Sequence, residues 1–189
     1  MAKKCGFIVF PTVSYGVSME HDPFFNITLQ GNTLFWILSH IDFSLRDQGI
    51  ESIIILNGHH GNIHSMKRIE KSNIQGANEK LKDSYKRKVR CYSYWHFMKH
   101  EFDHAGFVET SLMLAISDKV KMKKAKKGLI TKGMSEKEKK RIGKLATQPG
   151  GFPKVAKNGV WGDPTNATKK DGEKFLAEIV RNLAKECQS

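Results

Sequence analysis

The stretch that most constrains the fold is the aliphatic run Ile53-Ile54-Ile55-Leu56, which ends at Asn57-Gly58 and is followed by His59 and His60. Consecutive aliphatic residues are typical of a short strand buried on both faces, as in parallel sheets. Asn-Gly indicates a turn, and ligands bind at the carboxyl ends of strands in open α/β sheets. A histidine there can meet a metal or a substrate through its neutral imidazole. The alternative is a surface turn that carries two histidines.

The apolar periodicity alternates between strands and helices along the chain. Such a rhythm predicts an α/β fold with a mostly parallel sheet and right-handed crossovers. The length of 189 residues fits a single domain over residues 1–189. The expected strands are 5–10, 53–56 and 89–95, and the expected helices are 33–48, 63–81, 109–116, 135–144 and 171–185. Ser135 and Glu138 have the spacing of a capping box, which supports the start of the helix at 135.

Cysteine usage and hydropathy indicate the compartment. Cys5, Cys91 and Cys187 are far apart and form no Cys-x-x-Cys pair, which argues against a zinc ribbon or a disulfide framework and suits a reducing cytoplasm. No apolar run is long enough to span a bilayer, and the first residues lack the apolar region of a signal peptide. We therefore expect a soluble cytoplasmic protein with no membrane partner.

The formal net charge is +13, and much of it lies between Lys119 and Lys144. A basic cluster of this kind can neutralise phosphates and bind nucleic acid. The cluster lacks interleaved aromatic residues and a nucleic-acid-binding module, so nucleic acid is the less favoured partner. Attraction of an anionic substrate or partner uses the same field.

Four ordered segments resemble motifs of the creatininase (creatinine amidohydrolase) family. Asn57–Asn62 is similar to its Asn-Gly-His-x-Gly-Asn signature, and Ser14–His21 to its Tyr-Gly-x-Ser-x-Glu-His stretch. His104–Ser111 is similar to its His-Ala-Gly-x-x-Glu-Thr-Ser motif, and Gly159–Thr168 to its closing Gly-Asp-Pro segment. Together these motifs extend over nearly the whole chain.

The resemblance implies a three-layer α/β/α creatininase-like fold and the chemistry of a metal-dependent amidohydrolase. Such enzymes commonly use two divalent metals, zinc or manganese, to lower the pKa of a bridging water and polarise a carbonyl. The expected substrate is a small molecule with a cyclic amide, a formamide or a related C–N bond. Family members commonly form homo-oligomers, so a homo-oligomer is expected here.

The resemblance also assigns residue roles. His59 and Glu109 correspond to metal ligands, and His104 corresponds to the residue that transfers the proton. Asn57 and Asn62 would shape the histidine turn through hydrogen bonds. The residues expected to line the substrate pocket are Ser18, His21, Trp95, Asn57 and His60. From the residues alone, the carboxylate of Glu109 could instead interact favourably with the dipole at the start of a helix. Ser18 and His21 could likewise be polar loop residues whose side chains cap nearby backbone groups.

The chain departs from the family pattern near its start. Family members carry an earlier segment resembling Gly-Ser-x-Glu-x-His-Gly-x-His-Leu-Pro, which supplies further metal ligands and the first strand, and we expect both to be missing here. One interpretation is a hydrolase that is active only with a missing segment or with ligands from a neighbouring subunit. The alternatives are a catalytically silent binding or assembly protein and a polyanion-binding protein. The presence of His59, His104 and Glu109 together favours the hydrolase over the silent relative.

Overall fold

The computed structural model describes residues 1–75, 88–101 and 103–188. The chain forms two compact units, neither of which is continuous in sequence. Unit 1 consists of Met1–Thr12, Met19–Asn26 and Trp95–Ser189, and unit 2 consists of Val13–Ser18 and Ile27–Tyr94. Each unit is described by itself below. The single domain expected over residues 1–189 stays a prediction.

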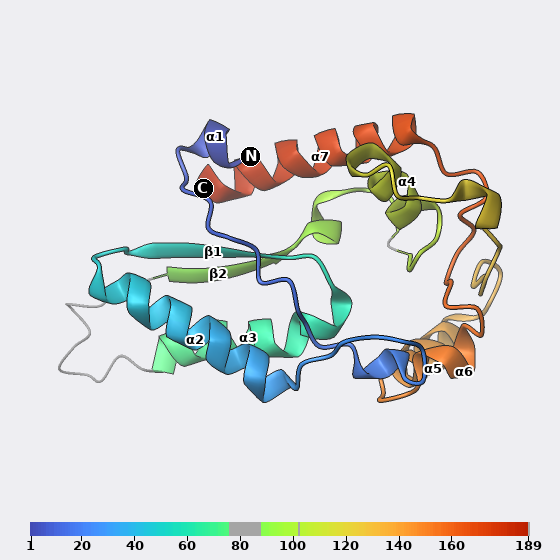
Figure 1. The fold of residues 1–189 in the computed structure, drawn as a ribbon, viewed down its shortest axis with the longest axis horizontal. Coiled ribbons are helices and arrows are strands. Elements are labelled where there is room, and N and C mark those ends of the chain that lie inside the picture. Colours follow the sequence, from blue (N-terminus) through green and yellow to red (C-terminus); the bar gives the residue numbers. More distant parts are fainter. Residues whose placement is uncertain (76–87, 102, 189) are drawn as a thin grey trace. The chain divides into compact units, whose positions relative to one another are not determined.

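Unit 2 is built on a parallel pair of strands, β1 (Ser52–Asn57) and β2 (Lys88–Ser93), with Ile55 opposite Cys91. Helices α2 (Gly31–Asp47) and α3 (Ile63–Gln75) lie on one side of the pair (Figure 1). Parallel neighbours need a crossover, and α3 lies in the connection between them. This arrangement confirms the predicted α/β class and the parallel pairing. The part of the expected helix beyond Gln75 lies outside the described residues.

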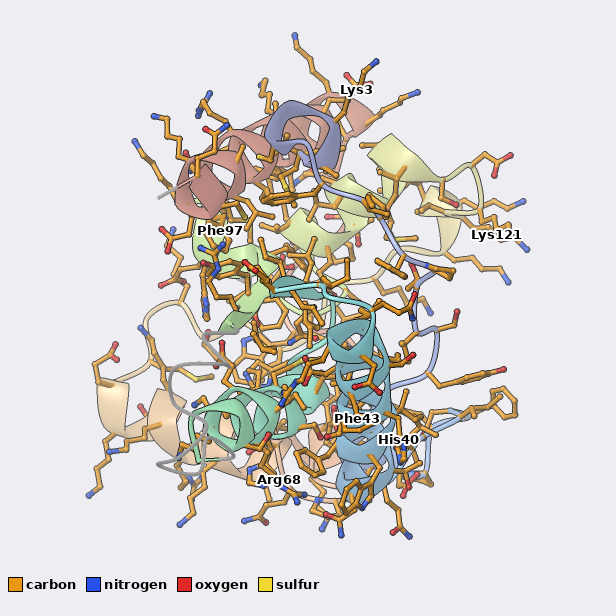
Figure 2. The ribbon with its side chains drawn as sticks, turned by 90° about the vertical axis from the view of Figure 1, so that its left-hand side faces the viewer. Lys3, His40, Phe43, Arg68, Phe97 and Lys121 are labelled. Atoms are coloured by element: carbon orange, nitrogen blue, oxygen red, sulfur yellow. The ribbon has the colours of Figure 1, made fainter. Side chains whose placement is uncertain are left out.

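Helix α2 is amphipathic, as its sequence predicts. Leu34, Leu38 and Leu45 are buried at helical spacing, whereas the side chains of Trp36 and Phe43 are 59% and 62% exposed. Figure 2 labels Phe43 and His40 on this helix. Contacts between α2 and α3 include the guanidinium of Arg68, whose central carbon lies 4.1 Å from the centroid of the Phe35 ring.

Strand β1 differs from its prediction in burial. Ile53, Ile54 and Ile55 are half-buried, and Leu56 is 50% exposed. Among the described residues β1 pairs with β2 alone, and a sheet of two strands offers little surface for other elements to cover both of its faces. The expectation of burial on both faces is therefore wrong for the chain as described.

The expected strand at 5–10 is also wrong. Residues Ala2–Cys5 form the short helix α1, which ends at Gly6 with φ at 69°, a left-handed conformation that glycine adopts readily. Phe7–Phe10 then run without strand pairing, and Ile8 and Val9 are more than 70% exposed. A strand needs a partner ladder, and the described residues of unit 1 offer none to this segment.

The core of unit 1 lies between α4 (Phe107–Ile116) and α7 (Lys169–Gln188). Val108 and Ser111 of α4 are buried, as are Ile179 and Leu183 of α7. The helices approach closely because α7 has glycine at 172, where a Cβ would collide with the carbonyl oxygen of Ser111. Ile179 and Leu183, four residues apart on α7, thus face the core of unit 1.

A second cluster in unit 1 surrounds Phe152. It contains the buried residues Ala146, Phe152 and Ala156, which come from α5 (Glu136–Ala146), α6 (Phe152–Val155) and the residue after α6. The predicted capping box begins α5: the Ser135 hydroxyl accepts a hydrogen bond from the Glu138 N–H, and the Glu138 carboxylate accepts one from the Ser135 N–H. The shorter elements are η1 (Met19–His21), η2 (His60–Asn62), η4 (Tyr94–Phe97) and η5 (Met122–Lys124).

No helix within residues 1–75, 88–101 and 103–188 combines the length and the apolar character needed to cross a membrane.

Candidate active site

The histidine turn after β1 is fixed by the side chain of Asn57, which is 2% exposed. Its Oδ1 accepts hydrogen bonds from the His59 N–H at 3.0 Å and from the Asn62 amide at 3.2 Å. Its Nδ2 donates to the hydroxyl of Ser93 on β2 at 3.2 Å. Both asparagines therefore shape the turn through hydrogen bonds, as expected.

Residues Ser14–Ser18 of the predicted loop motif join this turn within unit 2. Asn62 Oδ1 accepts a hydrogen bond from the Val17 N–H at 2.9 Å, and a Cβ at Gly16 would meet the Asn62 side chain. The loop thereby places the Ser18 hydroxyl 3.1 Å from Nε2 of His59. Two predicted site residues, Ser18 and His59, are thus in contact. His60, predicted to line the pocket, has an exposed side chain at the start of η2.

In unit 1, His104 and Glu109 lie together at the start of α4. Oε2 of Glu109 accepts a hydrogen bond from the Ala105 N–H at 2.7 Å and lies 3.9 Å from Nδ1 of His104. Ala105 has a positive φ of 50°, an uncommon conformation for a residue with a Cβ. The backbone of His104 exchanges two hydrogen bonds with Trp161, at 3.0 and 2.8 Å. The motifs at 104–111 and 159–168 are therefore joined directly.

Asp103 supports this part of the candidate site and was missed by the sequence reasoning. Its carboxylate accepts hydrogen bonds from the N–H groups of Val108 at 2.8 Å and Glu109 at 3.1 Å, which are first-turn donors of α4 without a helical acceptor. Burial raises the pKa of this carboxyl, while the two backbone hydrogen bonds and His100 oppose the rise. The available signal was an aspartate shortly before a helix start, where such residues serve as caps.

His21 lies against His104 within unit 1. Their ring centroids are 4.9 Å apart in a stacked arrangement, and Phe152 contacts both rings edge-on, with its centroid 4.9 Å from that of His21 and 4.5 Å from that of His104. The carboxylate of Glu20 lies 3.6 Å from Nε2 of His21. The predicted pocket residue His21 is therefore a neighbour of the predicted proton-transfer residue His104.

Trp95 is 8% exposed, and its ring contacts that of His96. Its predicted role in the pocket stays a prediction. His96 lies in η4, which ends at Phe97, so His100 lies beyond that helical turn. The ring of His100 instead lies near those of Phe107 and Phe175, with centroids 5.8 and 5.4 Å apart.

The predicted residues thus form two groups. Ser18, Asn57 and His59 are in contact or linked by hydrogen bonds within unit 2, and His21, His104 and Glu109 within unit 1. Imidazole and carboxylate side chains of both groups have the chemistry of divalent-metal ligands and proton carriers.

Comparisons with known proteins agree with these motifs. Two curated relatives are both named mycofactocin precursor peptide peptidase. The one from Mycobacterium ulcerans (strain Agy99) is 27% identical over 93% of this chain and 63% of its own length. The one from Mycolicibacterium smegmatis (strain ATCC 700084 / mc(2)155) is 28% identical over 94% of this chain and 65% of its own length. This chain therefore spans slightly less than two thirds of these relatives.

The fold is that of creatininases. A solved structure of manganese creatininase superposes with a TM-score of 0.73 and 24% identity, over 98% of this chain and 76% of that one. The sequence model of the creatininase family, described as creatinine amidohydrolase, matches residues 1–187. The chain belongs to the creatininase family.

Proposed function

We propose that this protein is a metal-dependent hydrolase of amide C–N bonds, with His59 and Glu109 as metal ligands and His104 as the proton carrier. The observation that carries the proposal is the pairing of His104 and Glu109, whose Nδ1 and Oε2 atoms lie 3.9 Å apart at the start of α4. An imidazole beside a carboxylate is suited both to ligate a cation and to move a proton.

The residues present fit a divalent cation. Imidazole nitrogen and carboxylate oxygen are ligands of zinc, and manganese accepts the same donors. The ring of His59 is oriented by the hydroxyl of Ser18 at 3.1 Å, and metal-binding histidines are commonly oriented by such a second contact. A bound divalent metal supplies a water of lowered pKa and polarises the substrate carbonyl.

His104 is held in a way that suits proton transfer. Its backbone N–H and C=O are both hydrogen-bonded to the backbone of Trp161. Its ring packs against the rings of His21 and Phe152. An imidazole changes its charge near neutral pH, so it can take a proton and release it within one turnover. His104 would accept the proton of the attacking water and deliver it to the nitrogen that leaves when the C–N bond breaks.

The substrate of the proposed reaction is a small molecule or peptide that contains an amide. The sequence led to the expectation of a cyclic amide, a formamide or a related C–N bond. The two curated relatives are named peptidases, which supports a peptide amide as the scissile bond. The homo-oligomeric state and cytoplasmic location remain predictions.

The test is metal content per chain after loading with zinc or manganese, measured together with hydrolysis of an amide panel that includes short peptides. We expect about one to two ions per chain in the wild type. Glu109→Gln should remain folded and lose metal, and His104→Ala should keep metal and lose hydrolysis. Glu173→Gln, an exposed carboxylate on α7, is the matched control. Stoichiometric metal in Glu109→Gln would contradict the ligand assignment. A wild type without metal or hydrolysis would favour a catalytically silent binding or assembly protein.

A further inference from the structure

A cavity of about 290 Å³ lies in unit 1 beside η5 and opens to solvent. Lys121, Lys124 and Lys126 are among the residues that line it. We infer that this lysine cavity binds an anionic group of the substrate, a carboxylate or a phosphate. The inference rests on the proposed function, because it names the substrate class of the same site.

The charge of the wall is of one sign. Each of the three lysines is exposed, and among the described residues that line the cavity none is acidic. Figure 2 shows Lys121 at the outer edge of this segment. An anion bound in the cavity would be attracted by the positive charges of these lysines. A concave site with charges of one sign also raises the local concentration of an oppositely charged ligand.

The lysine cavity is lined in part by sequence neighbours of two proposed site residues. Ala105 and Thr110 line it, and they directly follow His104 and Glu109 in the sequence. The Thr110 hydroxyl donates a hydrogen bond to the Ala105 carbonyl at 3.3 Å. This bond holds the residues before α4 against its first turn. An anionic group held in the cavity would therefore lie next to the segment that carries the proton carrier His104 and the proposed ligand Glu109 at the start of α4.

The other lining groups limit the kind of anion. Val120, Met122 and Val160 give the cavity an apolar surface, and its volume is at the low end of the range for ligand pockets, roughly 300–1,000 Å³. No aromatic ring is among its described lining residues, whereas single-stranded nucleic acid is usually held by stacking on aromatic side chains. A small anionic group with an apolar body, such as the terminal carboxylate of a peptide, matches these features.

Binding can be measured without hydrolysis, by calorimetry at low ionic strength. The probes are an N-acetylated tripeptide with a free C-terminal carboxylate, the same tripeptide with an amidated C-terminus, and inorganic phosphate. We expect the free acid to bind at least about tenfold more tightly than the amide, because the amide lacks the charge-assisted contact. Displacement of the free acid by phosphate would support a site that binds either anion. Tighter binding of phosphate than of the free acid would indicate that the natural ligand carries a phosphate.

The variant removes the three lysines of the cavity as Lys121→Gln/Lys124→Gln/Lys126→Gln. The matched control removes the same charge from exposed lysines that do not line it, as Lys119→Gln/Lys123→Gln/Lys140→Gln. We expect the cavity variant to lose the preference for the free acid and the control to keep it. Equal binding of acid and amide by the wild type, or an equal loss in both variants, would overturn the inference, because a general positive field would then explain the binding.

The binding assay and the hydrolysis assay can fail independently. A wild type that prefers the free acid through the cavity lysines but contains no metal and cleaves no amide would support the lysine cavity and refute the hydrolase. A metal-containing wild type that cleaves an amide but binds acid and amide equally would refute the cavity alone.

Discussion

The carboxylate of Asp103 accepts a hydrogen bond from the backbone N–H of Glu109, with 3.1 Å between Oδ1 and the nitrogen. The same carboxylate accepts a second bond from Val108, so it fixes the first turn of the helix that carries Glu109. A Cβ at Gly106 would collide with this carboxylate, which explains why glycine occupies the turn between them.

We predict that Asp103→Ala lowers the free energy of unfolding by about 1–3 kcal/mol, because two helix donors lose their acceptor. Urea denaturation monitored by circular dichroism measures the change. Asp118→Ala, at an exposed carboxylate after the same helix, serves as control and should change stability by less than about 0.5 kcal/mol. Equal effects of the two substitutions would contradict the capping role of Asp103.

Asn57→Ala should cost about 2–3 kcal/mol of stability, since the His59 N–H and the Asn62 amide would lose a buried acceptor. The comparison is Asn166→Ala, which removes an exposed amide from a loop of unit 1. Thermal and urea unfolding of both variants measure the two losses of stability. A loss no larger at Asn57 than at Asn166 would show that the histidine turn does not depend on this side chain.

Ser18→Ala is expected to weaken metal binding about 10–100-fold if His59 is a ligand, because the hydroxyl that orients its ring would be gone. Competition with a chromogenic chelator gives the affinity. Ser14→Ala, at an exposed position of the same loop, should leave the affinity unchanged. An unchanged affinity in Ser18→Ala would mean that this contact does not support a metal ligand.

Cys91 should resist alkylation. Burial, and then the nearby carboxylate of Glu70, raise the pKa of its thiol to about 12, and about 0.1% of a thiol is ionised three pH units below its pKa. The thiolate is the reactive form, so labelling of the folded protein by iodoacetamide should remain slow at Cys91 up to mildly alkaline pH. Peptide mass spectrometry reports the rate, and the urea-unfolded chain shows that the site can react. Rapid labelling of the folded protein would contradict the raised pKa.

Ser135→Ala should destabilise the protein by about 1 kcal/mol through loss of the cap of α5, whereas Ser135→Thr should be nearly neutral. The Ser135 hydroxyl is the largest cause that lowers the pKa of Glu138 below its ordinary 4.5. The ionised carboxylate therefore stabilises the fold above that value, and its contribution is lost as pH falls through the lower folded-state pKa. We therefore expect the difference in the free energy of unfolding between wild type and Ser135→Ala to become smaller as the pH is lowered from neutral to acidic, which urea denaturation at each pH measures.

The features predicted correctly are those that local physics determines. The capping box at Ser135 and Glu138 and the apolar spacing of α2 and α7 depend on residues three to four positions apart. The hydrogen-bonding role of Asn57 in its turn is similarly local. The grouping of His104 with Glu109 came from the family motif, and the start of α4 brings the two side chains together.

The features predicted incorrectly depend on distant partners. Residues 5–10 have the composition of a strand, but strand formation needs another strand's ladder, which composition does not contain. The burial of Leu56 likewise depends on which elements pack on the faces of the sheet. Asp103 was missed because its bonds to Val108 and Glu109 require a loop that folds back on the helix, and such loop geometry has no simple sequence period.

The different burial of the tryptophans gives each unit its own optical reporter. Trp36 is the tryptophan of unit 2 and is 59% exposed, whereas Trp95 of unit 1 is 8% exposed. A dissolved quencher such as iodide will therefore reach the indole of Trp36 first, and the shielded emission will belong mainly to unit 1. In a Trp36→Phe protein the fluorescence would come from Trp95 and Trp161 alone, so melting of unit 1 could be followed by light emission without any added label.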